Sequence, residues 1–385
     1  MSTKTGLSSN LLESCTKMEF RKFGKHNVSI LGVGLFQPQC LTQEVNLKEY
    51  VAALKFALDF GVSIIDLGFP QYYSGDRSLV SECGELLNAA SDIVTVMNVN
   101  VYAVDNAATV ESELLDTLSI YGLSRVTYIQ MYGVDRVTWK KLNNLGILDC
   151  AKGLIQSGFA DGLTCYFTDD RFYLKPILES RAFDAISLEY SFIDIARNPG
   201  SLKLSKDFGL GIAVRGVTKD GRLAENLPPD IETIWSRNPE HSPIEWALSV
   251  VWDRPEISTA IIDMLTVAQA KYYCSFAESF SSEDADITGL ILAKQVSDIY
   301  FAKRMIRCMM CRACMPCPLG INTPRIAELY NEYLMYGNKV VPALQYKLEQ
   351  HNARLCSKCL KCAKTCPRLF PLHEIISEAD RVFTN

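Results

Sequence analysis

The stretch DFGVSIIDLG, residues 59–68, carries the chain from the end of one helix into a strand. Apolar residues recur at helical spacing from Leu47 to Leu58, and Gly61 is the kind of residue at which a helix ends. The β-branched run that follows predicts a short buried strand closed by Asp66. A carboxylate at that position must find a polar or charged partner, because burial is expected there.

The same alternation of helical patterns with β-rich runs recurs through the first three hundred residues. The strands are predicted in VSILGVGL from Val28, VSIIDL from Val62, IVTVMNV from Ile93, VTYIQMY from Val126, GLTCYF from Gly162, AISLEYS from Ala185, LGIAVRG from Leu210 and STAIIDM from Ser258. Regular alternation of this kind implies a parallel sheet, and eight repeats imply a closed (β/α)8 TIM barrel, so the fold class is α/β.

Chemistry in such barrels takes place at the carboxyl ends of the strands. The residues expected there are Asp66, Asn98, Tyr132, Tyr166, Tyr190, Arg215 and Asp263. For any single tyrosine of this group, packing or a solvent-facing hydrogen bond is the simpler explanation. Asp66 is the position at which function is expected first.

Eight cysteines gather in two short runs near the end of the chain. The first run consists of Cys308, Cys311, Cys314 and Cys317, and the second of Cys356, Cys359, Cys362 and Cys366. A proline follows the last cysteine of each run, and the second run has the spacing of bacterial ferredoxins. Thiolates three positions apart on a turning backbone can reach several irons of one cube. The runs therefore predict two [4Fe-4S] clusters.

Two points about these cysteines stay open on spacing alone. Eight thiolates could also hold two zinc ions, but zinc sites usually pair two C-x2-C knuckles across a gap, whereas here four cysteines arrive within about ten residues, twice. Cys317 and Cys366 could each serve the cluster of their own run or be exchanged between clusters. The ferredoxin spacing favours exchange.

The segment between the runs is expected to be helical. Thr323 and Pro324 resemble an N-cap with a first-turn proline, and Gly337 followed by Asn338 predicts the end of the helix. The helix has an apolar stripe formed by Ile326, Leu329, Tyr330, Tyr333 and Leu334, for which core packing is preferred over partner docking. A second helix is expected after Pro371, so the cysteine-rich part is predicted to be a small, mainly helical ferredoxin-like domain.

Composition limits the possible partners and locations. The chain has 385 residues, is 48% hydrophobic and 22% charged, and carries a formal net charge of −5, so nucleic acid is an unexpected partner. No apolar run is long enough to span a membrane, and the polar start lacks a secretory signal, so a cytoplasmic location is expected. We expect a flexible extension at 1–17, the barrel at 18–295 and the iron-sulfur domain at 296–385.

With these motifs, the chain resembles the aldo-keto reductase family, and in particular its branch with a ferredoxin-like C-terminal extension. The resemblance covers nearly everything from Met18 onward. It is carried by MEFRKFGKHNVSILGVGL, DFGVSIIDLG, SIYGLSRVTYIQMYGVD, GLGIAVRGV and STAIIDMLTVAQ in the barrel, and by CMPCPLGINTPRIAELYNEYLMYGN in the extension.

The resemblance implies a site for carbonyl reduction by a nicotinamide, with an aspartate, a tyrosine, a lysine and a histidine. Asp66 matches the aspartate, and Tyr73 or Tyr72 matches the tyrosine. The lysine position holds Asn98, and the histidine position holds Tyr132. A tyrosine without a nearby cation has a pKa of about 10 and is a poor proton donor near neutrality, so standard carbonyl reduction is doubtful. Asp66 also lacks its usual cation, unless Arg77, Arg215 or a ligand replaces it.

The same resemblance implies the residues that bind a cofactor. Tyr190 matches an aromatic that stacks on the nicotinamide ring, and it would equally suit a flavin or an aromatic substrate. Arg215 stands where the family often has a basic residue, and Thr266 and Gln269 partly match its phosphate and adenine contacts. Loop packing explains Thr266 and Gln269 equally well. NADP(H) or a flavin is thus a possible cofactor beside the clusters.

Three functions fit these features. The first is an oxidoreductase in which the clusters relay single electrons to or from a small molecule at the barrel mouth. The second is an NADPH-dependent aldehyde or ketone reductase with structural clusters. The third is a non-catalytic electron-transfer subunit that works with a redox partner protein. The first is preferred, because nicotinamides move electrons in pairs whereas iron-sulfur cubes move them singly.

Overall fold

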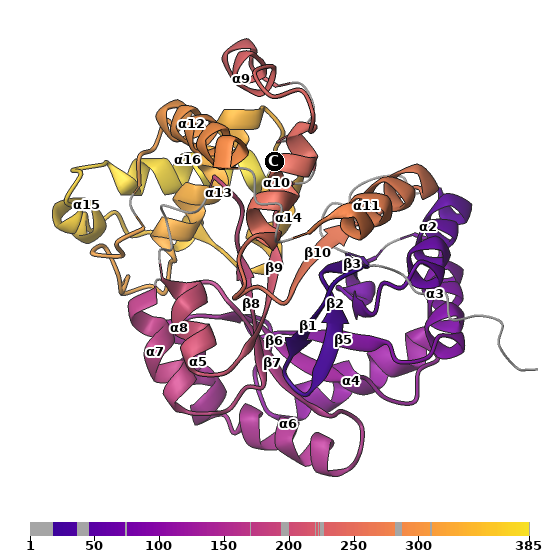
Figure 1. Cartoon of the computed structure of the whole chain (residues 1–385). Coiled ribbons are helices and arrows are strands. Elements are labelled where there is room, and N and C mark those ends of the chain that lie inside the picture. The colour runs from indigo at the N-terminus through magenta and orange to yellow at the C-terminus, as the bar shows by residue number, and fades with distance from the viewer. Residues whose placement is uncertain are drawn as a thin grey trace, which may run out of the picture.

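A computed structural model describes residues 18–36, 46–73, 75–169, 171–193, 200–219, 221, 223, 227–281, 287–308 and 310–384. The predicted barrel is confirmed: eight parallel strands follow one another around a closed sheet, with the last strand beside the first (Figure 1). In barrel order they are β3 Leu31–Gly34, β4 Ile64–Asp66, β5 Val94–Asn100, β6 Tyr128–Val134, β7 Gly162–Phe167, β8 Ala185–Glu189, β9 Gly211–Arg215 and β10 Thr259–Asp263.

A hairpin precedes the barrel, as the family resemblance implies. It pairs β1 Phe20–Phe23 with β2 His26–Ser29 in antiparallel register. Phe23 is buried with Val28 and Tyr128 in a core cluster, and the Phe23 and Tyr128 rings meet edge to face at 5.6 Å. The hairpin therefore adds apolar packing at the amino end of the strands and leaves the opposite end to the functional loops.

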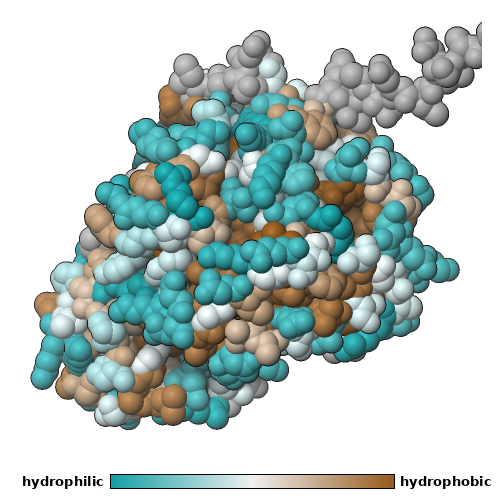
Figure 2. Space-filling view, turned by 90° about the horizontal axis from the view of Figure 1, so that it is seen from below, coloured by the Kyte–Doolittle hydropathy of each residue, from teal (hydrophilic) through white to brown (hydrophobic). Residues whose placement is uncertain are grey.

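Helices surround the sheet and bury their apolar sides against it. They are α2 Leu47–Asp59, α3 Ser78–Ala89, α4 Ala108–Tyr121, α5 Arg136–Asn144, α6 Ile147–Gln156, α7 Arg171–Glu179, α8 Ser201–Asp207, α9 Pro229–Trp235, α10 Pro243–Trp252 and α11 Val267–Ser279. Figure 2, which views the molecule from the side of α4 and α6, shows hydrophilic side chains over much of the outer surface. The amphipathic helices thus separate the core from solvent.

The C-terminal part is helical, as expected, and lies beside the barrel (Figure 1). Its helices are α12 Ile287–Lys303, α13 Thr323–Tyr336, α14 Val340–Leu348, α15 Lys361–Thr365 and α16 Leu372–Thr384. Since α12 is continuous and contacts both α9 and α10, the expected domain division at residue 295 falls inside a helix that packs on the barrel. The expected extension 1–17 lies outside the described residues. We use the name C-terminal module for residues 304–384.

The module has its own small core, which the apolar stripe of α13 helps to form. Ile326 and Leu329 are buried there with Ile376 and Phe383, and Tyr330 and Tyr333 pack against this cluster. Core packing is thus confirmed for these four stripe residues, and the helix after Pro371 is α16.

One detail of α13 differs from the prediction. Asn322, and not Thr323, is the N-cap, because its side-chain oxygen accepts a hydrogen bond from the Arg325 backbone N–H. The predicted end is confirmed, since Gly337 takes the left-handed conformation of a helix C-cap. None of the helices within the described ranges is long and apolar enough to cross a membrane.

Candidate functional site

Asp66 closes β4 at the carboxyl end of the barrel, and its partner is Arg215 from the end of β9. The two side chains form an ion pair and are almost fully buried, with 2% and 10% of their side-chain areas exposed. Burial lowers the pKa of Arg215 to about 10, which still leaves it charged near neutral pH. Of the cations considered from the sequence, Arg215 is therefore the one that compensates Asp66.

Asn98, at the position of the family lysine, also contacts Asp66. Its amide nitrogen donates to Asp66 Oδ1 at 2.7 Å, and its own oxygen accepts from the Gln130 amide at 2.6 Å. Ser187 Oγ donates to Gln130 Oε1 at 2.5 Å. Four strands, β4, β5, β6 and β8, thus contribute to one buried chain of hydrogen bonds that starts at Asp66 and holds each amide in a fixed orientation.

The histidine position is occupied by Tyr132, which forms part of an aromatic wall. Its ring stacks on Tyr166 with centroids 4.7 Å apart, and Phe69 meets it edge to face at 4.9 Å. The Arg215 guanidinium lies 5.7 Å from the centre of the Tyr166 ring. Burial raises the pKa of both tyrosines well above the ordinary value, so they are neutral and poor proton donors.

Of the two candidates for the family tyrosine, Tyr72 and Tyr73, Tyr72 contacts a polar residue of the mouth. Its hydroxyl is 3.5 Å from the amide nitrogen of Asn100, and 41% of its area is exposed. Tyr73 is 9% exposed and belongs to the main hydrophobic core, where its ring lies 5.1 Å from that of Phe36. Tyr72 and Tyr73 thus have different surroundings, one partly exposed beside Asn100 and the other in the hydrophobic core.

The expected cofactor residues have different surroundings. Tyr190 is buried directly after β8, and its backbone N–H donates to the Arg215 carbonyl at 3.0 Å. Thr266 is the N-cap of α11, because its hydroxyl accepts from the Gln269 N–H at 3.2 Å. The Gln269 side-chain oxygen accepts from the Leu265 N–H at 2.8 Å. Thr266 and Gln269 thus stabilise the turn after β10, which is the packing role that the sequence left open.

The C-terminal module reaches the barrel mouth at the end of β5. The Asn100 amide donates to the Leu348 carbonyl at 2.8 Å, between residues that are far apart in the sequence. The next residue, Glu349, is bound by Arg325 at 2.7 Å and by His351 at 2.7 Å. Burial alone would raise the pKa of Glu349, but Arg325 and His351 outweigh it and lower the pKa to about 2. This charged group therefore stays ionised against the mouth.

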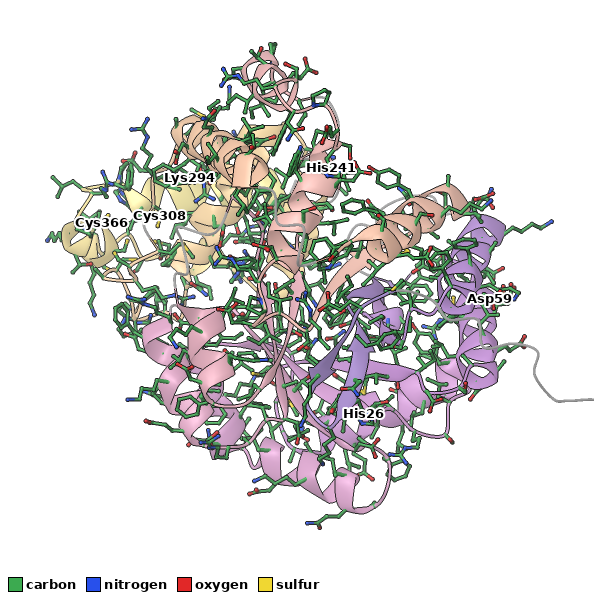
Figure 3. The ribbon with its side chains drawn as sticks, in the orientation of Figure 1. His26, Asp59, His241, Lys294, Cys308 and Cys366 are labelled. Atoms are coloured by element: carbon green, nitrogen blue, oxygen red, sulfur yellow. The ribbon has the colours of Figure 1, made fainter. Side chains whose placement is uncertain are left out.

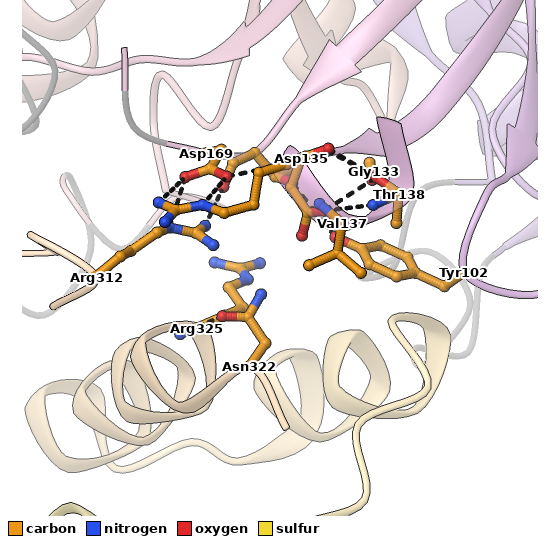
Figure 4. Close-up of polar contacts among 11 residues, drawn as sticks. Tyr102, Gly133, Asp135, Val137, Thr138, Asp169, Arg312, Asn322 and Arg325 are labelled. Carbon is orange, nitrogen blue, oxygen red and sulfur yellow. Dashed lines mark hydrogen bonds and ion pairs between the residues drawn. The ribbon is translucent and has the colours of Figure 1, made fainter. Parts of the chain in front are cut away.

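A second contact joins the first cysteine run to the end of β7. Arg312, between Cys311 and Cys314, forms an ion pair of 2.7 Å with Asp169 and donates to the Thr168 carbonyl at 3.0 Å. Arg136 binds the same carboxylate through two nitrogens, each at 3.0 Å. Figure 4 shows both guanidinium groups at Asp169, with Arg325 pointing toward them from α13. The Asp169 side chain is fully buried.

The eight cysteines are reduced thiols that range from buried to exposed. Burial, with smaller contributions from Cys308, Cys362 and Cys311, raises the pKa of Cys314 to about 12. Among the described residues, no three histidine, cysteine or acidic side chains lie close enough together to hold a single metal ion. One zinc ion would need each sulfur within about 2.3 Å of a common centre.

Burial also raises the pKa of Cys362, with further contributions from Cys356, Cys317 and Cys359. Cys317, the last residue of the first run, is therefore near the second run. In agreement with this, Cys317 and Cys356 pack against the same hydrophobic cluster. In the view of Figure 3, Cys308 and Cys366 lie at the same end of the module.

Comparison with known proteins supports the fold. No protein-family model matches the chain, and no curated protein matches it by sequence. An aldo-keto reductase from Bacillus halodurans matches with a TM-score of 0.59 and 16% identity, over 72% of this chain and 96% of the other. The chain has the barrel fold of the aldo-keto reductases.

Two further solved structures agree. A thermostable aldo-keto reductase, solved with the inhibitor epalrestat, matches with a TM-score of 0.58 and 14% identity, over 72% of this chain and all of the other. An aldo/keto reductase from Klebsiella pneumoniae, solved with NADP and acetate, matches with a TM-score of 0.57 and 13% identity, over 71% of this chain and 94% of the other. The matches leave more than a quarter of the present chain without a counterpart.

Several residues of the mouth were not identified from the sequence. They are Phe69, Asn100, Gln130, Asp169, Ser187, Arg312, Arg325, Glu349 and His351. Gln130 and Ser187 lie within strands, where a polar residue in an apolar run was the available signal. The module residues gave no such signal, because only the tertiary fold brings them to the barrel.

Proposed function

We propose that this protein is an iron-sulfur oxidoreductase built on an aldo-keto reductase barrel, with two [4Fe-4S] clusters in the C-terminal module. The clusters would relay electrons to or from a small molecule at the barrel mouth. The observation that carries this proposal is the contact of Arg312 with Asp169 and the Thr168 carbonyl, which fastens the first cysteine run to the end of the barrel where Asp66 lies.

The cysteines suit this cofactor. Cys308, Cys311, Cys314 and Cys366 would hold one cluster, and Cys356, Cys359, Cys362 and Cys317 the other. The neighbourhood of Cys317 and the second run supports this exchange between runs. The spacing of four cysteines within about ten residues, twice, suits a cube better than zinc, because each thiolate of a cube binds a different iron. When bound, each cluster accepts and releases one electron at a time.

The barrel residues would bind and orient the small molecule. The aromatic wall of Phe69, Tyr132 and Tyr166 offers apolar contact to a flat ligand, such as a nicotinamide, a flavin or an aromatic substrate. Asp66 is held ionised by Arg215, and Asn98 is fixed by Asp66 and Gln130. These residues can position a polar group of the ligand or exchange a proton at the Asp66 carboxylate.

Standard carbonyl reduction is disfavoured by the same geometry. The family mechanism uses a lysine to lower the pKa of its tyrosine, whereas here the lysine position holds an uncharged amide that is engaged with Asp66. Burial raises the pKa of Tyr132, so its hydroxyl stays protonated near neutral pH and gives up its proton poorly.

Anoxic purification followed by chemical reconstitution tests this proposal. We expect about eight irons and about eight acid-labile sulfides per chain. Cluster absorbance near 400 nm should bleach when a small viologen reductant is added. In separate samples of oxidised protein, NADPH or a free flavin is added, and the compound that bleaches the clusters identifies the natural electron route. Reconstituted protein with one iron-sulfur cluster or none would refute the two-cluster proposal.

The control separates this function from a conventional reductase. A carbonyl panel with NADPH is assayed for wild type, for Tyr72→Phe and for a Cys356→Ser/Cys359→Ser variant. A carbonyl reductase with structural clusters would lose activity in Tyr72→Phe and keep it in folded protein that has lost the second cluster. We expect instead that any turnover requires both clusters. The cytoplasmic location expected from the sequence remains a prediction.

A further inference from the structure

Both cysteine runs lie in segments of the chain that contain basic residues and no acidic ones. Residues 299–327 contain five lysines or arginines, residues 350–373 contain five more, and neither segment has an aspartate or glutamate. The chain as a whole carries a net charge of −5. Positive charge is therefore concentrated around the cysteines of an otherwise acidic protein.

The basic residues of the two segments divide into buried and exposed groups. Arg312 and Arg325 are buried and are neutralised by Asp169 and Glu349. The lysines of the second segment are exposed instead, and they are Lys358, Lys361 and Lys364. Within the described part of the chain, none of the ammonium groups of these three lysines forms an ion pair or a hydrogen bond. Their charge is thus directed to solvent.

Large apolar side chains are exposed in the same segment as these lysines. Leu355 is 59% exposed, Leu360 is 39% exposed and Leu369 is 81% exposed. Cys359 is also exposed and lies in the sequence between Lys358 and Leu360. Apolar side chains gathered within a basic segment are typical of a surface that another molecule covers.

The surface lies on the outer part of the module. Figure 1 shows α15, residues Lys361–Thr365, at the edge of the molecule, away from the barrel strands. Figure 3 places Cys366 in this same outer region. The buried Arg312 binds the barrel residue Asp169, and the buried Arg325 binds Glu349 within the module, whereas the loop around α15 presents lysines, leucines and a cysteine to solvent. We use the name α15 face for residues 354–369.

We propose that the α15 face docks an acidic electron-carrier protein, such as a flavodoxin-type or ferredoxin-type carrier. This inference rests on the proposed clusters, since the exposed Cys359 would bring one of them near the docked carrier. In the exchange, one electron leaves the reduced carrier and enters the cluster, so that the carrier is oxidised and the cluster reduced by one electron each. No bond is formed or broken.

Charge complementarity selects this kind of partner. Exposed lysines attract an acidic protein over a distance of about 10 Å at 0.1 M ionic strength. Once the two proteins are in contact, the exposed apolar side chains pack against the partner. Nucleic acid fits less well, because the acidic remainder of the chain repels a phosphate backbone. The α15 face would thus be the entry point for electrons that leave the module at the barrel mouth.

Binding of a purified acidic flavodoxin to the reconstituted full-length protein tests this inference. The test variant is Lys358→Gln/Lys361→Gln/Lys364→Gln. The matched control is Lys55→Gln/Lys152→Gln/Lys175→Gln, which removes the same charge from exposed lysines on the barrel helices. At low salt we expect the Kd for oxidised flavodoxin to rise about tenfold in the test variant and to stay unchanged in the control.

Two further measurements make the outcome decisive. Iron and sulfide content, together with reduction by methyl viologen, should be equal in all three proteins. If wild type contains no clusters, the proposed function fails; if clusters are intact but the flavodoxin Kd is the same in all three proteins, the docking inference fails alone. Sedimentation with phosphatidylglycerol vesicles that depends on the three lysines, without flavodoxin binding, would also overturn it in favour of a membrane surface.

Discussion

Asp66 is a buried carboxylate that pairs with a cation from another strand. Arg215 reaches it across the barrel mouth, and Asn98 and the Gly68 N–H donate to the same carboxylate at 2.7 and 2.9 Å. If only the cation is removed, the buried carboxylate is left with an uncompensated charge. If both charged side chains are removed, no uncompensated charge remains. Removing Arg215 alone is therefore expected to lower the free energy of unfolding more than removing Arg215 and the Asp66 charge together.

Replacing Arg215 by leucine tests this coupling. Arg215→Leu should lower the free energy of unfolding by roughly 3–5 kcal/mol, because Asp66 is left charged and buried. The double variant Asp66→Asn/Arg215→Leu should recover a large part of that loss. Denaturant unfolding of each protein gives both values.

An exposed ion pair provides the control. Lys203→Ala, which breaks an exposed pair with Asp207 on α8, should cost no more than about 1 kcal/mol. Equal losses in the single and double variants of the buried pair would show that Arg215 does not stabilise Asp66.

At this scale, the sequence predicted which carboxylate needed a partner and named Arg215 among three possible ones. The sequence did not predict the chain of hydrogen bonds that joins Asn98 to Gln130 and Ser187. Asn98 and Gln130 are Cα partners in the register of β5 and β6, and this register appears only when the barrel closes. From the sequence, Thr266 and Gln269 could be interpreted either as cofactor-binding residues or as residues that stabilise a loop, because an N-cap and a cofactor contact use the same residue types.

At the scale of elements, all eight barrel strands were predicted, because each is a β-rich run between helical patterns. The helix α14 was not predicted, since its span Val340–Leu348 is short and contains Pro342 in its first turn. The cap of α13 was misplaced by one residue because Asn322 and Thr323 are both good N-cap residues. Side-chain geometry, and not propensity, decides between them.

The loop that holds the first cysteine run is fastened to the barrel by one carboxylate. Asp169 binds Arg136 from α5 and Arg312 from the loop, so it joins three segments. Asp169→Asn should weaken both contacts and leave two buried guanidinium groups without a counter-charge. We expect amide hydrogen exchange in residues 307–320 to become at least tenfold faster, because local opening requires less free energy.

The matched control is Asp149→Asn, which removes an exposed carboxylate that pairs with Lys152 on α6. It should leave exchange in the cysteine loop unchanged. If Asp169→Asn speeds exchange only in α5 and leaves the loop protected, Arg312 is not what holds the first run to the barrel.

At the scale of the whole molecule, the mouth is a composite of two parts of the chain that are distant in sequence. Asn100 meets Leu348, and the ionised Glu349 raises the pKa of Tyr132 further after burial has raised it. The sequence identified both parts but not their contact, because neither apolar periodicity nor cysteine spacing specifies how two folded surfaces meet. The positions that the resemblance assigns to a lysine and a histidine hold Asn98 and Tyr132, and the module brings Arg325 close enough to act electrostatically on Tyr132.

The two buried carboxylates at this junction give the molecule opposite responses to pH. Glu349 has a folded pKa of about 2, below the ordinary 4.5, so its contribution to stability is present above pH 4.5 and is lost as the pH falls toward 2. Glu113 on α4, which accepts a hydrogen bond from the Asn100 backbone, has a pKa raised to about 7, by burial first and Asp116 to a lesser degree. The contribution of Glu113 to the free energy of unfolding is fully present below pH 4.5 and is lost as the pH rises through 7.

From these two carboxyls, stability should be greatest near pH 4.5, and Glu113 should lower the free energy of unfolding as the pH rises from about 4.5 to 7. Glu113→Gln removes the cost of ionising a buried carboxyl, so it should raise the free energy of unfolding at pH 8.5 by about 2–3 kcal/mol relative to its effect at pH 5. Denaturant unfolding of holoprotein between pH 5 and 9 measures this difference, with Glu111→Gln, an exposed change on the same helix, as the control. A Glu113→Gln effect that is the same at both pH values would mean that this carboxyl ionises in the folded protein as easily as in water.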